Sequence, residues 1–216
     1  MCGRYTLVAS TEHIMGRFGL QSAEAAIAPR YNIAPTQPAA VVLNTAPQTL
    51  SIAQWGVVPP WPSQRGTVTR LINARVETLA QKFRRLLNQR CLVLADGFYE
   101  WRRLPNGGKQ PMRITLASGE LFAMAGLWDI HRLPDGRTIR TFTVITTAPN
   151  PLVASIHARM PAILPKESEI DWLSRDQFDL SALHTPFPAD SMIAYPVSPR
   201  VNDPKYDDPQ LIQPLR

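Results

Sequence analysis

Cysteine and histidine are scarce in this sequence, which has two Cys and four His among 216 residues. They form no CxxC, HExxH or similar spacing, so we expect no bound metal. We also expect no cofactor, because no segment matches a phosphate-binding loop, a dinucleotide-binding fingerprint or a serine-hydrolase elbow. In a cytosolic protein thiols stay reduced, so Cys2 and Cys91 are expected to be free.

Long apolar segments are also missing. No stretch of about 18 apolar residues is present, which argues against a membrane span. The N-terminus has no basic segment followed by an apolar one, so we expect no secretion signal and a cytoplasmic protein. No internal repeat or low-complexity tract occurs either. These absences favour a globular protein that does not act at a membrane.

The composition is that of a folded protein, with 44% hydrophobic and 19% charged residues. The length suits one large domain or two small ones, and we expect a single domain over residues 1–216 whose tail, from about residue 197, wraps the surface. The net charge is +6, and 19 of the 23 basic residues are Arg. Because Arg binds phosphates bidentately and stacks on bases, the charge indicates an anionic partner. A genomic bias toward Arg codons would give the same composition.

Apolar patterning predicts six strands and three helices. The helices are Thr11–Phe18 with Thr11 as its cap, an amphipathic helix over Val76–Leu87, and Ser168–Leu173 after a proline. Hairpin turns are expected at 105–108 and 133–136. Strands and helices do not alternate regularly, which favours an α+β fold over a doubly wound sheet. The predicted strands are Ala39–Leu43, Leu50–Trp55, Cys91–Leu94, Met112–Leu116, Leu121–Leu127 and Thr141–Thr146.

One of the two cysteines directly follows the initiator Met1. If Met1 is removed, Cys2 carries an α-amine with a reference pKa of about 7.7–8.0 beside a thiol with one of about 8.5. The amine can form a Schiff base with an aldehyde, and the thiolate can then close a five-membered thiazolidine ring. No internal cysteine can do this. The alternative is that Cys2 is simply a small buried residue.

Three further segments concentrate reactive side chains, and each also has a structural interpretation. Asn73 could cap the helix expected to begin near Val76. Glu100 lies in an aromatic run that would raise its pKa, but it could also be an outward-facing strand residue. His157, two residues before Arg159, could be a structural histidine.

Taken together, these segments resemble the SRAP family, the abasic-site processing proteins of bacteria and eukaryotes. The matching blocks keep the order of the family and extend from residue 1 to about residue 200. The CGR start and the LINARVET block are specific to the family, whereas the ADGFYEW and IHARMP blocks only support the resemblance. The blocks are MCGRY (Met1–Tyr5), YNIAPTQ (Tyr31–Gln37), WGVVPPW (Trp55–Trp61), LINARVET (Leu71–Thr78), LADGFYEW (Leu94–Trp101) and IHARMPAIL (Ile156–Leu164).

The resemblance implies a fold and a function. Family members bind single-stranded DNA at abasic sites and link covalently to them, and the C1′ aldehyde of the opened sugar is an electrophile suited to Cys2. The implied fold is a β-rich α+β domain with curved, barrel-like antiparallel sheets and peripheral helices. The expected partner is single-stranded DNA containing abasic sites, bound by a monomer that is cytoplasmic and associates with the nucleoid when bound to DNA.

The resemblance also assigns roles to individual residues. Cys2 would supply both the amine and the thiol, and Glu100 would be the general acid/base. Asn73 would hold the Cys2 backbone or the sugar hydroxyl, and His157 would assist proton transfer at the sugar ring oxygen. The DNA-binding residues would be Arg4, Arg75 and Arg159 on phosphates and Pro35 and Trp61 on bases.

Two other functions are compatible with the sequence. Cys2 could be the nucleophile of a peptidase, including an autopeptidase that removes Met1 with help from Glu100 or His157. The chain could also bind single-stranded DNA without a covalent link, with a structural Cys2. A comparison of the unaltered protein with Cys2→Ala, in which the yield of covalent adduct with abasic DNA is measured, separates the three hypotheses.

Overall fold

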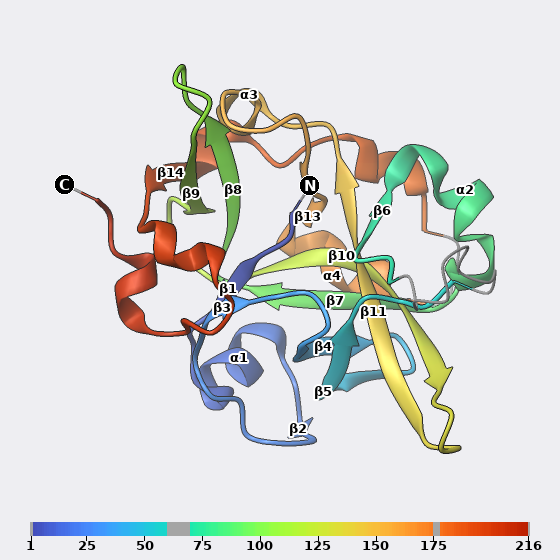
Figure 1. Ribbon diagram of the computed structural model, residues 1–216. Helices are drawn as coiled ribbons and strands as arrows, with labels where there is room; N and C mark the ends of the chain where they lie inside the picture. The colour runs from blue at the N-terminus through green and yellow to red at the C-terminus, as the bar shows by residue number, and fades with distance from the viewer. Residues whose placement is uncertain (1, 60–69, 175–177, 216) are drawn as a thin grey trace.

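Five strands close into a small barrel at the centre of the molecule (Figure 1). The computed structural model describes residues 2–59, 70–174 and 178–215. Neighbouring barrel strands are antiparallel, except that β11 pairs in parallel with β5 and thereby closes the ring. In order around the barrel the strands are β5 (Ala46–Trp55), β4 (Pro38–Leu43), β7 (Arg90–Ala95), β10 (Phe122–Arg132) and β11 (Thr138–Thr147).

Four short strands extend this barrel sheet, and five others form a second sheet. Of the short strands, β6 (Asn73–Arg75) and β12 (Met160–Pro161) pair with β11, β13 (Ile163–Leu164) pairs with β10, and β2 (Ser22–Ala23) pairs with β5. The expected β-rich α+β fold is confirmed. The second sheet has the order β14 (Met192–Pro196), β9 (Lys109–Leu116), β8 (Gly97–Arg103), β1 (Tyr5–Leu7) and β3 (Arg30–Ile33).

Short helices lie at the periphery (Figure 1). None in the described part of the chain is long and apolar enough to cross a membrane. The α-helices are α1 (Thr11–Phe18), α2 (Leu79–Lys82), α3 (Pro151–Ala154) and α4 (Glu169–Leu173). The 3₁₀ turns are Val76–Thr78, Arg84–Leu86, Lys166–Ser168, Leu180–His184, Ala189–Ser191, Pro199–Asn202 and Pro209–Ile212.

The first predicted helix has the expected bounds, but its predicted cap is wrong. Ser10 is the N-cap, and its hydroxyl accepts a hydrogen bond from the His13 N–H at 3.3 Å. The Thr11 hydroxyl instead accepts from the Ile27 N–H at 2.8 Å, which ties the loop after the helix to its first turn. Both hydroxyls satisfy backbone donors, so sequence alone does not distinguish their roles.

The predicted helix over residues 76–87 is wrong as a continuous element. The backbone leaves the helical region at Thr78 (φ −119°, ψ 8°) and at Phe83 (φ −121°, ψ 16°). The result is one turn of α-helix, α2, between two 3₁₀ turns. The buried side chains Val76, Leu79, Phe83 and Leu86 still share one apolar face, and two of their spacings are three residues, which is the period of a 3₁₀ turn. The third predicted helix is likewise shorter, because a 3₁₀ turn precedes α4.

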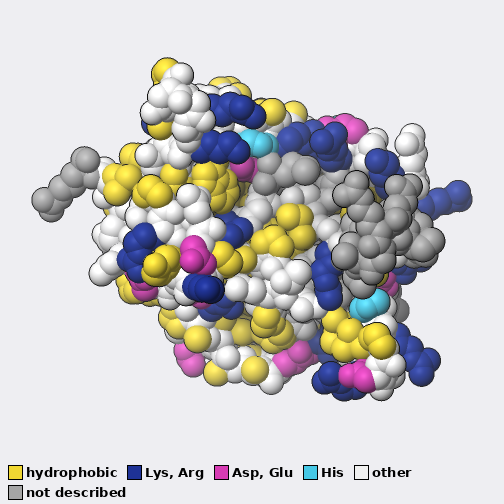
Figure 2. Space-filling view, in the orientation of Figure 1, with side chains coloured by type: hydrophobic (Ala, Val, Ile, Leu, Met, Phe, Trp, Pro, Cys, Tyr) yellow, Lys and Arg dark blue, Asp and Glu magenta, His cyan; other side chains and the backbone are white. Residues whose placement is uncertain are grey.

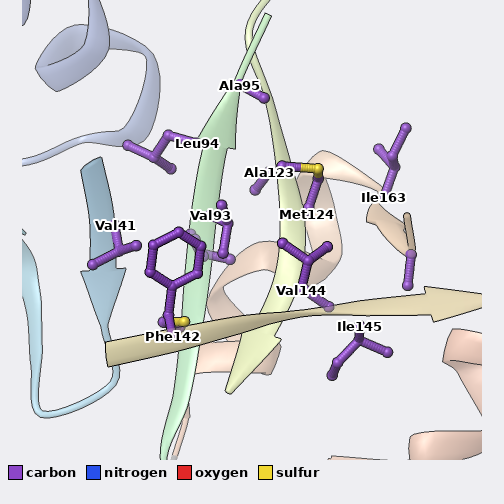
Figure 3. Packing of buried hydrophobic residues seen from close by; sticks show 14 of the residues in the cluster. Val41, Val93, Leu94, Ala95, Ala123, Met124, Phe142, Val144, Ile145 and Ile163 are labelled. Carbon is purple, nitrogen blue, oxygen red and sulfur yellow. The ribbon is translucent and has the colours of Figure 1, made fainter. Parts of the chain in front are cut away.

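Apolar side chains pack inside the barrel (Figure 3). In Figure 3, Phe142 of β11 lies between Val41 of β4 and Val93 of β7, and all three are fully buried. Trp55 stacks on Phe142 with ring centroids 6.2 Å apart. The residues predicted to be reactive at positions 73 and 100 lie instead on β6 of the barrel sheet and β8 of the second sheet.

The segment after Pro196 is fastened to the second sheet. Asn32 of β3 is fully buried, and its side-chain amide lies within hydrogen-bond distance of three carbonyls of this segment, at 2.9 to 3.2 Å. Val201 and Leu211 of this segment pack against Tyr99 in a second, smaller hydrophobic cluster. Because side chains alternate along a strand, Tyr99 anchors one face of β8 while the next residue points to the other face.

Candidate active site

Glu100 is the buried carboxyl of the site. It follows Tyr99 on β8, and the residue is only 2% exposed. Burial penalises the carboxylate and raises the pKa of Glu100 to about 7. The interpretation of Glu100 as an outward-facing strand residue is therefore wrong, and the pKa shift has the predicted direction.

Cys2 lies beside this carboxyl and is fully buried. Pairing of β1 with β8 brings the N-terminal segment to this strand, and the Tyr99 N–H donates to the Arg4 carbonyl at 2.9 Å. Burial, and then the charge of Glu100, raise the pKa of the Cys2 thiol far above its ordinary value. The thiol is thus protonated in this arrangement, in contrast to the ready nucleophile expected of a free N-terminal cysteine.

Asn73 holds the backbone of Cys2. The side-chain amide of Asn73 donates a hydrogen bond to the Cys2 carbonyl at 2.9 Å. Asn73 begins β6, which pairs in parallel with β11 through Val144. The interpretation of Asn73 as a helix cap is wrong, because the residue belongs to a strand that ends before the first turn.

His157 lies close to the same carboxyl. It follows α3, whose cap Asn150 accepts a hydrogen bond from the Val153 N–H at 2.9 Å. The His157 Nδ1 atom lies 3.6 Å from Glu100 Oε1. Partial burial lowers the pKa of His157, and the positive charges of the N-terminus and of Lys109 lower it further. A lowered pKa favours the neutral imidazole, which can both donate and accept a proton.

An open groove of about 580 Å³ lies beside Glu100 and His157. Glu100 and His157 line one part of it, and the cations Arg102, Arg103 and Lys109 line another. In Figure 2, Lys and Arg side chains gather over β8 and β9 and again over the upper ends of β11 and β6, with a histidine between the two groups. Sequence reasoning missed the three cations of the hairpin, although no acidic residue lies among them to neutralise their charge.

The residues expected to bind DNA are in differing environments. Arg159 is bound to Glu77 by two hydrogen bonds of 2.5 and 3.0 Å, and Arg4 donates to the Asn202 carbonyl at 3.2 Å. Arg75 is exposed on β6, and Pro35 is half-buried in the turn between β3 and β4. Trp61 lies outside the described residues.

The arrangement places a titratable carboxyl beside the thiol of residue 2. A carboxyl with a pKa of about 7 can donate and accept protons at neutral pH. The Asn73 amide holds the Cys2 carbonyl, and the His157 imidazole is a second titratable group close to Glu100. Across residues 2–59, 70–174 and 178–215, no three His, Cys, Asp or Glu side chains are grouped so that they could hold a metal ion.

Comparisons with known proteins identify the family of this chain. The chain is 43% identical over 222 residues to the abasic site processing protein YoqW of Bacillus subtilis (strain 168), covering 99% of each. It is 31% identical over 226 residues to the abasic site processing protein HMCES of Gallus gallus, covering 87% of this chain and 66% of that protein. A crystal structure of a Bacteroides thetaiotaomicron protein matches with a TM-score of 0.88 and 27% identity over 100% of both chains. Residues 1–204 match the SOS response associated peptidase (SRAP) family, and the chain belongs to that family.

Proposed function

We propose that this protein acts on abasic sites in single-stranded DNA and links covalently to them through Cys2 once Met1 has been removed. The observation that carries the proposal is the 2.9 Å hydrogen bond from Asn73 to the Cys2 carbonyl, because it holds residue 2 beside a buried acid/base. Relatives named abasic site processing proteins support the choice of substrate. The adduct would shield the lesion.

The proposed reaction joins one aldehyde carbon to two atoms of one residue. The Cys2 amine attacks C1′ of the ring-opened sugar, and the carbinolamine loses water to give a Schiff base. Sγ then adds to the same carbon while the imine nitrogen takes up a proton, which closes the thiazolidine. One water leaves overall, and no oxidant or reductant is required.

Glu100 and His157 would carry the protons. Because the pKa of Glu100 is about 7, both of its protonation states are populated at neutral pH. Protonated Glu100 would release water from the carbinolamine, and the resulting carboxylate would accept the thiol proton. His157, 3.6 Å from this carboxyl, would protonate the sugar ring oxygen as the sugar opens. We propose a monomer that works in the cytoplasm, at the nucleoid.

A second candidate is an autopeptidase that removes Met1, which is favoured by the peptidase description of the family. Cys2 would need Glu100 to accept its proton first, since the pKa of its buried thiol is strongly raised. Removal of Met1 by a host aminopeptidase needs no such transfer, so we rank it first. Intact mass of protein produced without an aminopeptidase, for the parent chain and Glu100→Gln, separates the two routes. Loss of Met1 in the parent chain only would support the autopeptidase.

The proposal is tested with an oligonucleotide carrying one abasic site. After incubation and heating, a denaturing gel should show a stable adduct with the unaltered protein and none with Cys2→Ala. Cys91→Ala is the matched control, because it removes the other buried thiol and should leave the adduct intact. A full yield of adduct from Cys2→Ala would refute the proposal. Salt-sensitive binding without any adduct would instead identify a non-covalent binder.

A further inference from the structure

We propose that the β8–β9 hairpin is a second DNA-contact surface, in which Arg102, Arg103 and Lys109 bind backbone phosphates on one side of the lesion. This inference rests on the proposed function and adds to it. Glu100 and His157 line the same groove as these cations, which lie farther along β8 and on the facing strand β9.

The three cations have no acidic partner in the part of the chain that the structure describes. All three side chains are exposed, and within residues 2–59, 70–174 and 178–215 no hydrogen bond or ion pair engages their charged ends. Arg17, in contrast, binds Glu169 through two hydrogen bonds of 3.0 and 2.8 Å. The positive charge of the hairpin is therefore available to bind an anionic partner.

The hairpin also brings like charges together. Arg103 and Lys109 are directly opposite each other in the antiparallel pairing of β8 and β9. Like charges in this position destabilise a strand pair. The connecting residues 104–108 contain no Asp or Glu that could offset the repulsion. A phosphate between the two side chains would turn this repulsion into attraction, so the arrangement fits an anionic ligand.

The position of the hairpin identifies which anion it meets. β8 runs directly from Glu100 to the cations, and at about 3.4 Å per residue they lie about 7–10 Å along the strand. That distance is about two to three nucleotides of one strand in B-form DNA. All of these residues line the same groove, so a strand that leaves a lesion at Glu100 in this direction must cross the hairpin.

The other direction from the site has its own cation. The β8–β9 hairpin and β6 lie on opposite sides of the N-terminus in Figure 1, and β6 carries the exposed Arg75. The strand on one side of the lesion would therefore meet the hairpin, and the strand on the other side would meet β6. This placement predicts that the hairpin contributes to binding of one DNA arm only.

The test measures the salt dependence of DNA binding by fluorescence anisotropy. The probe is a single-stranded oligonucleotide with a tetrahydrofuran abasic analogue, which has no aldehyde and cannot be crosslinked. Replacing three phosphate contacts, with Arg102→Gln, Arg103→Gln and Lys109→Gln together, should reduce the slope of log affinity against log salt by about 2. Over a fourfold change in salt this is about a 16-fold smaller change in affinity. Circular dichroism checks that the variant is folded.

The matched control removes three positive charges elsewhere. Arg132 and Arg137 lie at or beside the β10–β11 hairpin, and Lys166 lies in the turn before α4. All three are exposed and none lines the groove. Changing these three to Gln alters the net charge by the same amount, so the slope should stay near that of the unaltered protein. An equal loss of slope in both variants would mean that net charge alone governs binding and would overturn the inference.

Two further oligonucleotides, each shortened on one side of the lesion, locate the contact. With one of these oligonucleotides the hairpin variant should show a smaller slope of log affinity against log salt than the unaltered protein, and with the other it should show the same slope. An equal reduction with both would refute the one-sided placement. Crosslinking of the unaltered protein to true abasic DNA is measured in parallel. If the adduct forms and the hairpin variant keeps the full slope, the inference is wrong and the proposed function stands. If no adduct forms but the slope still falls, the hairpin binds DNA and the proposed function fails.

Discussion

Glu100→Gln should stabilise the protein at alkaline pH. Burial raises the pKa of this carboxyl from 4.5 to about 7, so the folded state favours the neutral form by two to three pKa units. At about 1.4 kcal/mol per unit, ionised Glu100 costs about 3 kcal/mol of folding free energy. Gln has nearly the same shape and cannot ionise, so the substitution removes this cost.

The sign of the pH dependence follows from proton binding. The pKa of Glu100 is higher in the folded than in the unfolded chain, so the folded state binds the proton more tightly. The free energy of unfolding of the unaltered protein therefore falls as the pH rises from about 4.5 to about 7, and the full cost applies above this range. The advantage of Glu100→Gln should be greatest at pH 8.5 and should shrink toward zero near pH 4.5.

Thermal unfolding followed by circular dichroism measures this difference. For a chain of this length, 1 kcal/mol corresponds to about 2–4 °C in Tm, so the gain at pH 8.5 should be about 6–12 °C. The same variant should form adduct about 10²–10⁴-fold more slowly, because a general acid/base is lost. A Tm difference that does not change with pH, or a lower Tm for Glu100→Gln at pH 8.5, would refute the reasoning.

Glu77→Gln provides a control with the opposite sign. Hydrogen bonding to Arg159 lowers the pKa of Glu77, so this carboxylate stabilises the folded state above its unfolded pKa. Its stabilisation is lost as the pH falls through the lowered folded value. Glu77→Gln should therefore be slightly less stable than the unaltered protein at pH 8.5, by an amount that solvent exposure keeps small. A gain in stability for both variants would show that the Gln substitutions act through something other than these pKa shifts.

Three other substitutions test the structure around the site and the core. Asn73→Ala removes the 2.9 Å hydrogen bond to the Cys2 carbonyl, worth about 1 kcal/mol, so single-turnover crosslinking should slow about fivefold or more. Gly126→Ala places a methyl group 2.8 Å from Cys91 Sγ, and this overpacking should lower the free energy of unfolding in urea by about 1–3 kcal/mol. Asn32→Ala leaves three carbonyls of the C-terminal segment without their donor, so limited proteolysis should cut that segment first, in contrast to the unaltered protein.

Much of the sheet structure could be predicted because its signals are local. All six predicted strands are present, most of them longer than predicted, and both predicted turns connect hairpins. The Pro105–Gly108 turn joins β8 to β9, and the Leu133–Gly136 turn joins β10 to β11. Each signal consists of an apolar run followed by turn residues, so it depends on few distant contacts.

Closure of the barrel could not be read from the sequence. The parallel pairing of Thr141 with Gln54 joins strands that are far apart in the chain, and nothing local to either strand encodes it. The interrupted helix has a similar cause, because burial of Phe83 and Leu86 overrides the helical period of the segment. Tertiary packing decides both features.

The site shows the same division between local and distant information. The direction of the pKa shift of Glu100 could be predicted, although its cause is burial and the aromatic neighbours Tyr99 and Trp101 pack on the other face of β8. The engagement of Arg159 by Glu77 could not, because the two residues are 82 positions apart. The family resemblance predicts Arg159 as a phosphate ligand, whereas the structure gives it a carboxylate partner, Glu77, that DNA would have to replace or share.

The raised pKa of the Cys2 thiol sets the order of the proposed chemistry. Because the thiol binds its proton more tightly than Glu100 does, transfer from Sγ to Glu100 is unfavourable before substrate arrives. Once the amine has formed an iminium ion with the aldehyde, a positive charge lies on the same residue as the thiol. A nearby cation lowers a thiol pKa, so the proton can then pass to Glu100 as Sγ closes the ring. The amine must therefore react first, and a chain that retains Met1 lacks that first step even though its thiol, carboxyl and amide are already in place.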